Sequence, residues 1–415
     1  MVERPGNKPV VGVRWIFKTK LNLDGSIQKH KTRPLAKGYT QKPGVDFNKT
    51  FAPVARLDTI RTLIALAAQR NWKLFQLDVK SAFLNERSIS EATLYVKTKE
   101  SIGTVIVSIY VDDIVYTGSS SEMLEEFKED MMNKYEMTDL GLLHHFLGMG
   151  VIQKEWRIFI HQQKYAKTLL DRCVLKDCKP VSTPLVPTEK LKRQDEGELV
   201  DEETYRKIVG SLLYLKATRP DIMYSTSLLA RFMHGPSKKH FGAARRVLRY
   251  VQGTLDFGIE YESGKPAMLI GFCDSDWGGS EDDMKSKSGY AFSFGSGAFS
   301  WVSMKQNSVV LSIAEAGYVS AAEATTQEIW LRFVLGDFGE EQIEATPIMC
   351  DNMSTIAISK NPAFHQRSKD IGRKFHFIRD AIQGVVDLIY CKGQDSVVDI
   401  FTNALPRESF AAGCD

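Results

Sequence analysis

Apolar and polar positions in the first part of the chain alternate in a way that predicts strands followed by a helix. Residues 10–20 are predicted to form a strand, residues 28–39 a second, basic strand, and Asp24-Gly25 the turn between them. Apolar residues recur at helical spacing between 57 and 70, which predicts an amphipathic helix. A short apolar strand is expected over 74–79. The chain therefore opens with a hairpin and then a helix–strand pair.

An acidic pair stands inside the next apolar stretch. The segment 104–117 is apolar on both sides of Asp112-Asp113, and we expect two buried strands joined by a turn at these aspartates. Ser119 and Glu122 then have the spacing of a capping box, which predicts that a helix begins after Ser119.

The second half changes from a linker to helices and then to a new α/β pattern. Residues 180–203 carry three prolines and many charges, which predicts a linker. Residues 204–252 are mostly helical in pattern and include a basic stripe, Arg245, Arg246 and Arg249. From about 267 the expected elements are a strand to Asp274, hairpins over 289–311, a long helix over 312–335 and a strand that ends at Cys350-Asp351.

Composition places the chain among ordinary globular proteins. It has 415 residues, of which 43% are hydrophobic and 25% charged, so it is not disordered or fibrous throughout. At roughly 150 residues per domain it holds about two to three domains. The net charge of +3 says little about partners, but residues 1–70 contain 14 Lys and Arg against 4 Asp and Glu. This excess predicts either a surface that binds polyanions or a solvated basic face, and both remain open.

The cysteines and the hydropathy bear on the compartment. None of the six cysteines forms a CxxC pair or a cluster with zinc-ligand spacing, which favours reduced, buried thiols in an intracellular protein, cytoplasmic or nuclear. The N-terminus does not resemble a signal peptide, and no apolar run approaches about 18 residues, so no membrane partner is expected.

Three carboxylates are expected to meet in the first half. Asp78 ends one apolar strand, and Asp112 and Asp113 lie in the predicted turn of a buried hairpin. If these strands are neighbours, the side chains converge at one edge of a sheet. Phosphoryl transfer commonly uses two Mg²⁺ ions held by clustered carboxylates, whereas an acidic pair in a plain surface turn needs no metal. The apolar flanks favour the metal site.

Long motifs in the chain resemble those of copia-type LTR retrotransposons. The reverse transcriptase of these elements is similar in RWIFKTK (14–20), QLDVKSAFLN (76–85) and YVDD (110–113). Their ribonuclease H domain is similar in GFCDSDWGGS (271–280) and IMCDNMSTIAIS (348–359). The resemblance covers nearly the whole chain. It implies RNA-directed DNA synthesis and hydrolysis of RNA in an RNA–DNA hybrid, with Mg²⁺ or Mn²⁺ as cofactor and an RNA template, a DNA primer and dNTP as partners.

The resemblance implies roles for residues of the first half. Asp78 would bind both metal ions, and Asp112 and Asp113 would complete the polymerase site, with Asp112 the principal ligand. The turn at 146–148 resembles the primer-grip region, or is an ordinary turn. Three basic residues would contact the incoming dNTP or the template backbone, unless they are simply exposed charges: Lys31, Arg33 and Lys37.

In the ribonuclease H-like half, the resemblance implies four metal-binding carboxylates, of which two are recognised. Asp274 and Asp351 match two of them. Gly317 stands at the position of the catalytic glutamate, and Gly372 at the position of the fourth carboxylate. Glu315 lies about 200° around a helix from position 317, so we expect its side chain to point away. With two carboxylates absent, one metal site is expected to be lost.

The chain also departs from the family between Asn85 and Arg87. Family members carry there a segment of several dozen residues that includes motif B, which holds the nucleotide and the template. Its absence predicts impaired polymerisation. It also predicts an uncovered apolar sheet surface, at a cost on the order of 10 kcal/mol. A genomic deletion and a mis-predicted splice would both produce this gap.

The sequence thus predicts an α/β (α+β) fold in three parts. These are a reverse-transcriptase domain with fingers and palm over 1–185, a linker and helical connection over 186–265, and a ribonuclease H-like domain over 266–410. We expect a fragment of a retrotransposon polyprotein with weak or no catalysis. The alternatives are an active polymerase, a nucleic-acid-binding remnant without catalysis, and a pseudogene product.

Overall fold

A computed structural model gives the fold of most of the chain. The described residues are 13–21, 27–36, 55–79, 93–195, 197–360, 377–382, 384–393 and 396–414. The chain forms two compact units, one of residues 1–53 and 82–85 and one of the remaining residues. In the first unit the described residues form an antiparallel hairpin of β1 (Val13–Leu21) and β2 (Ile27–Ala36), in which Pro34 lies opposite Trp15.

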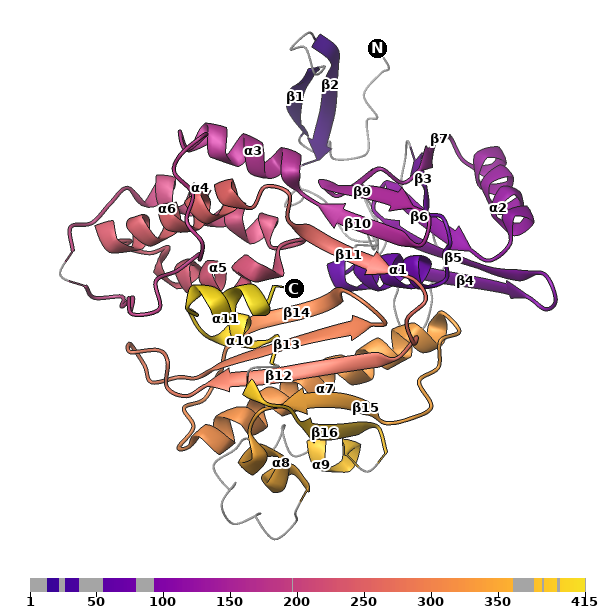
Figure 1. Cartoon of the computed structure of the whole chain (residues 1–415). Helices are drawn as coiled ribbons and strands as arrows, with labels where there is room; N and C mark the ends of the chain where they lie inside the picture. The colour runs from indigo at the N-terminus through magenta and orange to yellow at the C-terminus, as the bar shows by residue number, and fades with distance from the viewer. Residues whose placement is uncertain are drawn as a thin grey trace, which may run out of the picture. The chain divides into compact units, whose positions relative to one another are not determined.

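The second unit contains a five-stranded antiparallel sheet in the order β4-β5-β6-β3-β7 (Figure 1). Helix α2 (Ser121–Lys134) packs on β5, β6 and β7. The central strands β5 and β6 are buried along almost their whole length. The prediction of an uncovered sheet surface is therefore wrong for these strands. The strands are β3 (Phe75–Val79), β4 (Leu94–Lys99), β5 (Gly103–Tyr110), β6 (Asp113–Gly118) and β7 (Met137–Leu142).

The turn between β5 and β6 lies one residue earlier than the sequence predicts. Tyr110 pairs with Asp113 across the hairpin, so the two turn residues are Val111 and Asp112. Val111 takes a left-handed φ of 56°, which tight two-residue hairpin turns require. Asp113 is therefore the first residue of β6, where its backbone is fixed by strand pairing.

The start of α2 is also displaced by one residue. The hydroxyl of Ser120 accepts a hydrogen bond from the backbone N–H of Met123, which makes Ser120 the N-cap. Ser119 instead accepts from the backbone N–H of Thr104 with its side chain, at 2.9 Å. The predicted cap at Ser119 is wrong because that hydroxyl binds the neighbouring strand.

A four-stranded antiparallel sheet, in the order β11-β10-β9-β8, and a group of helices follow. The helices confirm the helical pattern of residues 204–252. The strands are β8 (His145–Phe146), β9 (Met149–Lys154), β10 (Arg157–His161) and β11 (Gly258–Glu262). The helices are α3 (Gln163–Arg172), α4 (Glu202–Leu215), η2 (Pro220–Ile222), α5 (Met223–Leu229), η3 (Ala230–Phe232) and α6 (Lys238–Gly253).

The basic stripe of α6 binds the chain itself. Arg246 donates a hydrogen bond to the hydroxyl of Thr183 at 3.0 Å, and Arg249 donates to the backbone oxygen of Lys179 at 2.8 Å. Of the three stripe arginines only Arg245 is exposed. Arg246 and Arg249 therefore hold the start of the predicted linker, at Lys179 and Thr183, against α6, so the stripe is not a continuous free surface for polyanions.

A second five-stranded sheet has the order β14-β13-β12-β15-β16. Strands β12, β15 and β16 run parallel, and β12, β13 and β14 pair antiparallel. Helices α7 (Ile313–Asp337) and α10 (Asp399–Thr402) both contact β12 and β13. The strands are β12 (Leu269–Asp276), β13 (Lys287–Phe294), β14 (Ala298–Lys305), β15 (Thr346–Cys350) and β16 (Val386–Tyr390). The other helices are α8 (Met353–Lys360), α9 (Ile378–Ala381) and α11 (Arg407–Ala412).

Helix α1 (Leu57–Gln69) lies in the interior of the second unit, against β10, β11 and β14 (Figure 1). Residues 59–68 are all buried, so the helix is buried on every side and not on one face as predicted. The guanidinium of Arg61 donates to the backbone oxygen of Phe299 at 2.7 Å and lies 3.6 Å from the ring centroid of Trp301. Helix α1 therefore packs against the second five-stranded sheet, although the two are far apart in the sequence.

The structure also addresses membrane spans and disulfides. Within the described ranges, no helix combines the length and the apolar character needed to cross a bilayer. The six cysteines, which all lie in the described ranges, form no disulfide; Cys273 and Cys350 are buried and the other four are half-buried.

Candidate metal centres

The first acidic cluster forms where β3 meets the β5–β6 hairpin. Asp78 of β3 pairs with Asp113 of β6, and the N–H of Val79 donates to the backbone oxygen of Asp112 at 2.8 Å. All three aspartates are half-buried. Strand pairing thus brings these three carboxylates to one end of the sheet.

The electrostatics of this cluster centre on Asp113. Burial raises the pKa of Asp113, and the nearby charges of Asp112 and Asp78 raise it further. A hydrogen bond from Gln76 Nε2 to Asp113 Oδ1, at 2.8 Å, acts in the opposite direction. The cluster gathers three carboxyl groups at one end of the sheet, but within the described residues their oxygens do not all lie within 4.8 Å of one another.

The turn between β8 and β9 is fixed by aromatic side chains next to this cluster. Phe146 is buried, and its ring meets that of Tyr110 edge-on at 6.1 Å. Leu147 and Gly148 have left-handed φ angles of 48° and 76°. The hydroxyl of Tyr214 donates to the backbone oxygen of Leu147 at 2.5 Å, and a Cβ atom at position 148 would overlap that hydroxyl. Glycine is therefore required here by both backbone and space.

The basic residues proposed to meet the nucleotide belong to the other unit. Lys31 and Arg33 lie on β2, where their partners across the hairpin are Lys18 and Ile16. Lys37 lies outside the described residues. So does the chain from 80 to 92, which includes the position of the expected gap.

The second acidic cluster gathers carboxylates from three separate elements. Asp274 lies on β12, Asp351 directly follows β15, and Asp399 is the first residue of α10. One carboxylate oxygen of each lies within 4.8 Å of the other two. Strands β12 and β15 are parallel, with Cys273 in register with Cys350, so the aspartates that follow them stand side by side. Helix α10 then brings in the third.

Burial and mutual repulsion disfavour the charged state of this cluster. Burial raises the pKa of Asp274 to about 7, and the charges of Asp399 and Asp351 contribute, while a hydrogen bond from the hydroxyl of Thr402 lowers it. Burial also raises the pKa of Asp351 and of Asp399. A divalent cation would offset this repulsion, and carboxylate oxygens are the donors that Mg²⁺ and Mn²⁺ prefer. The donor set therefore fits such an ion.

Gly317 lies beside this cluster. With Asp274 and Asp351 it lines a cavity of about 250 Å³. A Cβ atom at position 317 would overlap the hydroxyl of Thr355 and lie 3.2 Å from its Cβ. That hydroxyl donates to the backbone oxygen of Ala314 at 3.1 Å, which holds it in place. A glutamate at 317 would therefore compete with Thr355 for space.

Of the other positions that the sequence singles out, the structure describes Glu315 but not Gly372. Glu315 accepts a hydrogen bond from the backbone N–H of Leu311 at 2.8 Å, at the start of α7. Gly372 lies outside the described residues. The third carboxylate is instead Asp399, which the sequence reasoning missed. The available signal was an acidic residue that opens the helical segment VVDIFTNAL (397–405), after the last strand.

Known proteins resemble this chain over nearly its whole length. A family model described as reverse transcriptase (RNA-dependent DNA polymerase) matches residues 1–101 and 86–187. The retrovirus-related Pol polyprotein from transposon RE1 of Arabidopsis thaliana is 33% identical, over 98% of this chain and 31% of the relative. That from transposon TNT 1-94 of Nicotiana tabacum is 31% identical, over 99% of this chain and 36% of the relative. The chain thus spans about a third of the length of these relatives.

A shorter relative and the alignment lengths add detail. The uncharacterized mitochondrial protein AtMg00810 of Arabidopsis thaliana is 36% identical over 54% of this chain and 92% of its own length. The alignment with the RE1 protein runs over 461 positions although this chain has 415 residues, so at least 46 aligned positions have no residue of this chain. By these similarities the chain belongs to the copia-type retrotransposon Pol polyproteins and carries sequence of their reverse transcriptase.

Proposed function

We propose that the chain is a Pol segment whose best-preserved chemistry is divalent-cation binding in a ribonuclease H-like domain over 266–410. The observation that carries this proposal is the convergence of Asp274, Asp351 and Asp399 from three elements. The second sheet supports it, with three antiparallel strands followed by two parallel ones and a long helix against it. The remaining proposed parts are a reverse-transcriptase domain over 1–185 and a connection over 186–265.

The chain's own residues would prepare this centre for an RNA–DNA hybrid. Thr402 donates to Asp274 and so orients that carboxylate. The cavity beside Gly317 leaves room at the cluster but supplies no fourth carboxylate. Mg²⁺ or Mn²⁺ bound by these aspartates would polarise a phosphodiester oxygen and lower the pKa of a bound water. Without a carboxylate at 317, hydrolysis of the RNA strand is expected to be weak or absent.

The polymerase centre is proposed to be impaired. Asp78, Asp112 and Asp113 would hold the metal ions that act on dNTP at the end of a DNA primer paired with an RNA template. The surplus of aligned positions in the RE1 relative, and the family match in two segments that overlap at 86–101, support an internal deletion near 86–88. A deletion there would remove motif B, which holds the nucleotide.

A non-catalytic nucleic-acid-binding remnant, or a pseudogene product, is the second candidate. Gly317 favours it, because a glycine there supplies no carboxylate while α7 stays packed, with residues 315–322 all buried. Arg246 and Arg249 already bind groups of the chain itself. Binding to a nucleic-acid backbone would therefore rest on the basic residues of the first 70 positions. Such binding should weaken steeply with salt as counterions are released.

Calorimetric titration of Mn²⁺ into the purified chain tests the main proposal. The wild type should bind Mn²⁺, and Asp274→Asn should lose the tightest binding event. The same preparations should show little or no cleavage of RNA in a hybrid and no primer extension on an RNA template. Absence of Mn²⁺ binding would refute the proposed centre. Extension that Asp112→Asn abolishes would refute the proposed loss of polymerase activity.

A further inference from the structure

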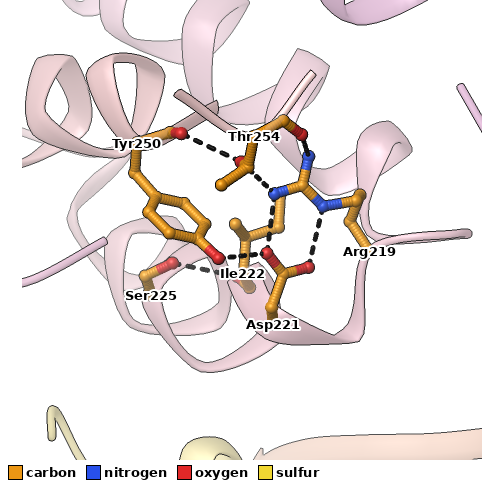
Figure 2. A network of polar contacts seen from close by, with 6 residues as sticks. All are labelled: Arg219, Asp221, Ile222, Ser225, Tyr250 and Thr254. Atoms are coloured by element: carbon orange, nitrogen blue, oxygen red, sulfur yellow. Dashed lines mark hydrogen bonds and ion pairs between the residues drawn. The ribbon is translucent and has the colours of Figure 1, made fainter. Parts of the chain in front are cut away.

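A buried ion pair lies in the helical segment, away from both acidic clusters. Arg219 and Asp221, 2% and 5% exposed, form a bidentate pair with N···O distances of 2.9 and 2.6 Å (Figure 2). The burial of such a pair is costly unless the remaining hydrogen-bonding groups are also satisfied.

Two further residues complete this network. The hydroxyl of Tyr250 donates to Asp221 Oδ2 at 2.7 Å. Arg219 donates to the backbone oxygen and the hydroxyl of Thr254, at 2.9 and 2.6 Å (Figure 2). Thr254 in turn donates to the backbone oxygen of Tyr250 at 2.9 Å. The network therefore joins η2 to the C-terminal end of α6, and its hydrogen bonds hold these groups in fixed positions.

The same residues support the helices at the end of the chain. Elements η2 and α5 contact α10. Asp221, Ser225, Ile400 and Phe410 line one small cavity of only about 10 Å³, so these segments pack closely. The ring of Tyr250 meets the ring of Phe410 in α11 edge-on, at 5.6 Å and 88°. The network thus forms the surface on which α10 and α11 rest.

Helix α10 depends on such support. It has four residues, Asp399–Thr402, and a single helical turn is unstable by itself because nucleation costs more than its hydrogen bonds return. Ile400 and Phe401 are buried, so tertiary packing sets the helix position. Its two ends carry the carboxylate of Asp399 and the hydroxyl of Thr402, which binds Asp274.

We infer that Arg219, Asp221 and Tyr250 are positioning residues for the second acidic cluster: they hold α10 where Asp399 reaches Asp274 and Asp351. The inference rests on the proposed function, because it assigns these residues a role in divalent-cation binding. It also makes the helical segment a required part of the metal centre, although none of the three carboxylates belongs to that segment.

The test compares two single-hydroxyl deletions in the full chain. Tyr250→Phe removes the bond to Asp221, and Tyr205→Phe removes an equally buried bond to the backbone oxygen of Leu229. Tyr250→Phe should weaken Mn²⁺ binding roughly tenfold, the lower end of what loss of a supporting partner does to a metal site. Tyr205→Phe should leave it unchanged. Phe410→Leu removes the ring that Tyr250 contacts on α11. It should weaken Mn²⁺ binding as Tyr250→Phe does.

Hydrogen exchange gives a readout that does not depend on metal. Amides of 399–404 should exchange faster in Tyr250→Phe than in the wild type, and at the wild-type rate in Tyr205→Phe. Unchanged exchange and unchanged Mn²⁺ affinity in Tyr250→Phe would overturn the positioning role. If the wild type binds no Mn²⁺ but the amides of 399–404 still exchange faster in Tyr250→Phe, the proposed metal centre is refuted. The role of the network in supporting α10 would then still hold.

Discussion

The two acidic clusters are built in different ways. In the first, Asp78 and Asp113 are direct partners on adjacent strands, and Asp112 is the neighbour of one of them. In the second, Asp274, Asp351 and Asp399 come from two parallel strands and a one-turn helix. Among the described residues, only the second cluster has one carboxylate oxygen from each aspartate within 4.8 Å of the other two. In the first cluster, strand pairing brings carboxyl groups to one end of a sheet. In the second, a helix packed against the strands adds the carboxylate that brings three oxygens within 4.8 Å of one another.

The largest expected effect concerns the missing carboxylate of the second cluster. Gly317→Glu with Thr355→Ala should raise Mn²⁺-dependent hybrid cleavage by roughly 10²- to 10³-fold, the scale on which single charged or polar groups act in catalytic sites. Gly317→Glu alone should recover much less, because its Cβ would overlap the Thr355 hydroxyl. Cleavage is measured on a labelled hybrid.

The matched control for this experiment is Gly317→Gln with Thr355→Ala, which has the same shape without the charge. It should remain inactive. Equal cleavage by Gly317→Glu with and without the Thr355 change would show that Thr355 does not restrict the site.

The next effect distinguishes the clusters as ligand sets. Asp399→Asn should weaken Mn²⁺ binding at least about a hundredfold, since loss of a direct ligand should cost no less than loss of its supporting partners. Asp112→Asn should change the tightest binding event little. Calorimetric titration of both variants measures this, and the reverse ranking would mean that the first cluster is the tighter site.

A smaller effect should appear in the pH dependence of stability. The pKa of Asp274 is about 7 in the folded chain, above its ordinary value of 3.8, so the folded state holds this proton more tightly. This stabilising contribution is complete below pH 4 and is lost as pH rises through about 7. Asp274→Asn mimics the protonated form. The free energy of unfolding of this variant should therefore exceed that of the wild type by about 2 kcal/mol at pH 8, after allowance for the partial exposure of Asp274. At pH 4 the two should differ little.

Urea unfolding at the two pH values, without divalent metal, measures this difference. A difference between variant and wild type that is the same at both values would show that Asp274 ionises normally in the folded chain.

The smallest effect tests the hydrogen bond that distinguishes Asp113. Gln76→Leu should raise the pKa of Asp113 further, because the bond from Gln76 lowers it. It should also cost about 1 kcal/mol of folding free energy, as for a typical lost hydrogen bond. Carboxyl NMR titration and denaturant unfolding read the two quantities, and an unchanged pKa would contradict the assigned role of Gln76.

The sequence predicted an element well where the hydrophobic pattern within that one strand or helix is enough to identify it. The short strand that ends near Asp78, the hairpin around the acidic pair and the long helix over 312–335 all appear close to their expected bounds. The register of the acidic turn could not be read, because pairing of Tyr110 with Asp113 depends on how both strands are held by their neighbours.

The second cluster was predicted only in part, for a related reason. Asp274 follows the apolar run of its strand and Asp351 directly follows an apolar strand, so their sequence context signals an edge of a sheet. Asp399 opens a helix of one turn whose position is set by residues of the distant helical segment. The bonds of Arg246 and Arg249 were missed for the same cause, since an arginine on a helix surface has the same pattern whether or not a neighbouring segment covers it.

The interior position of α1 has a consequence for synthesis of the chain. Its Arg61 binds the backbone of Phe299, 238 residues later. At about 5–20 residues per second, roughly 10 to 50 s separate the emergence of the two partners from the ribosome. During that interval a helix that is finally buried on every side has no β14 to pack against. Nascent chains of this protein should therefore recruit chaperones between these two points of elongation, whatever the state of either acidic cluster.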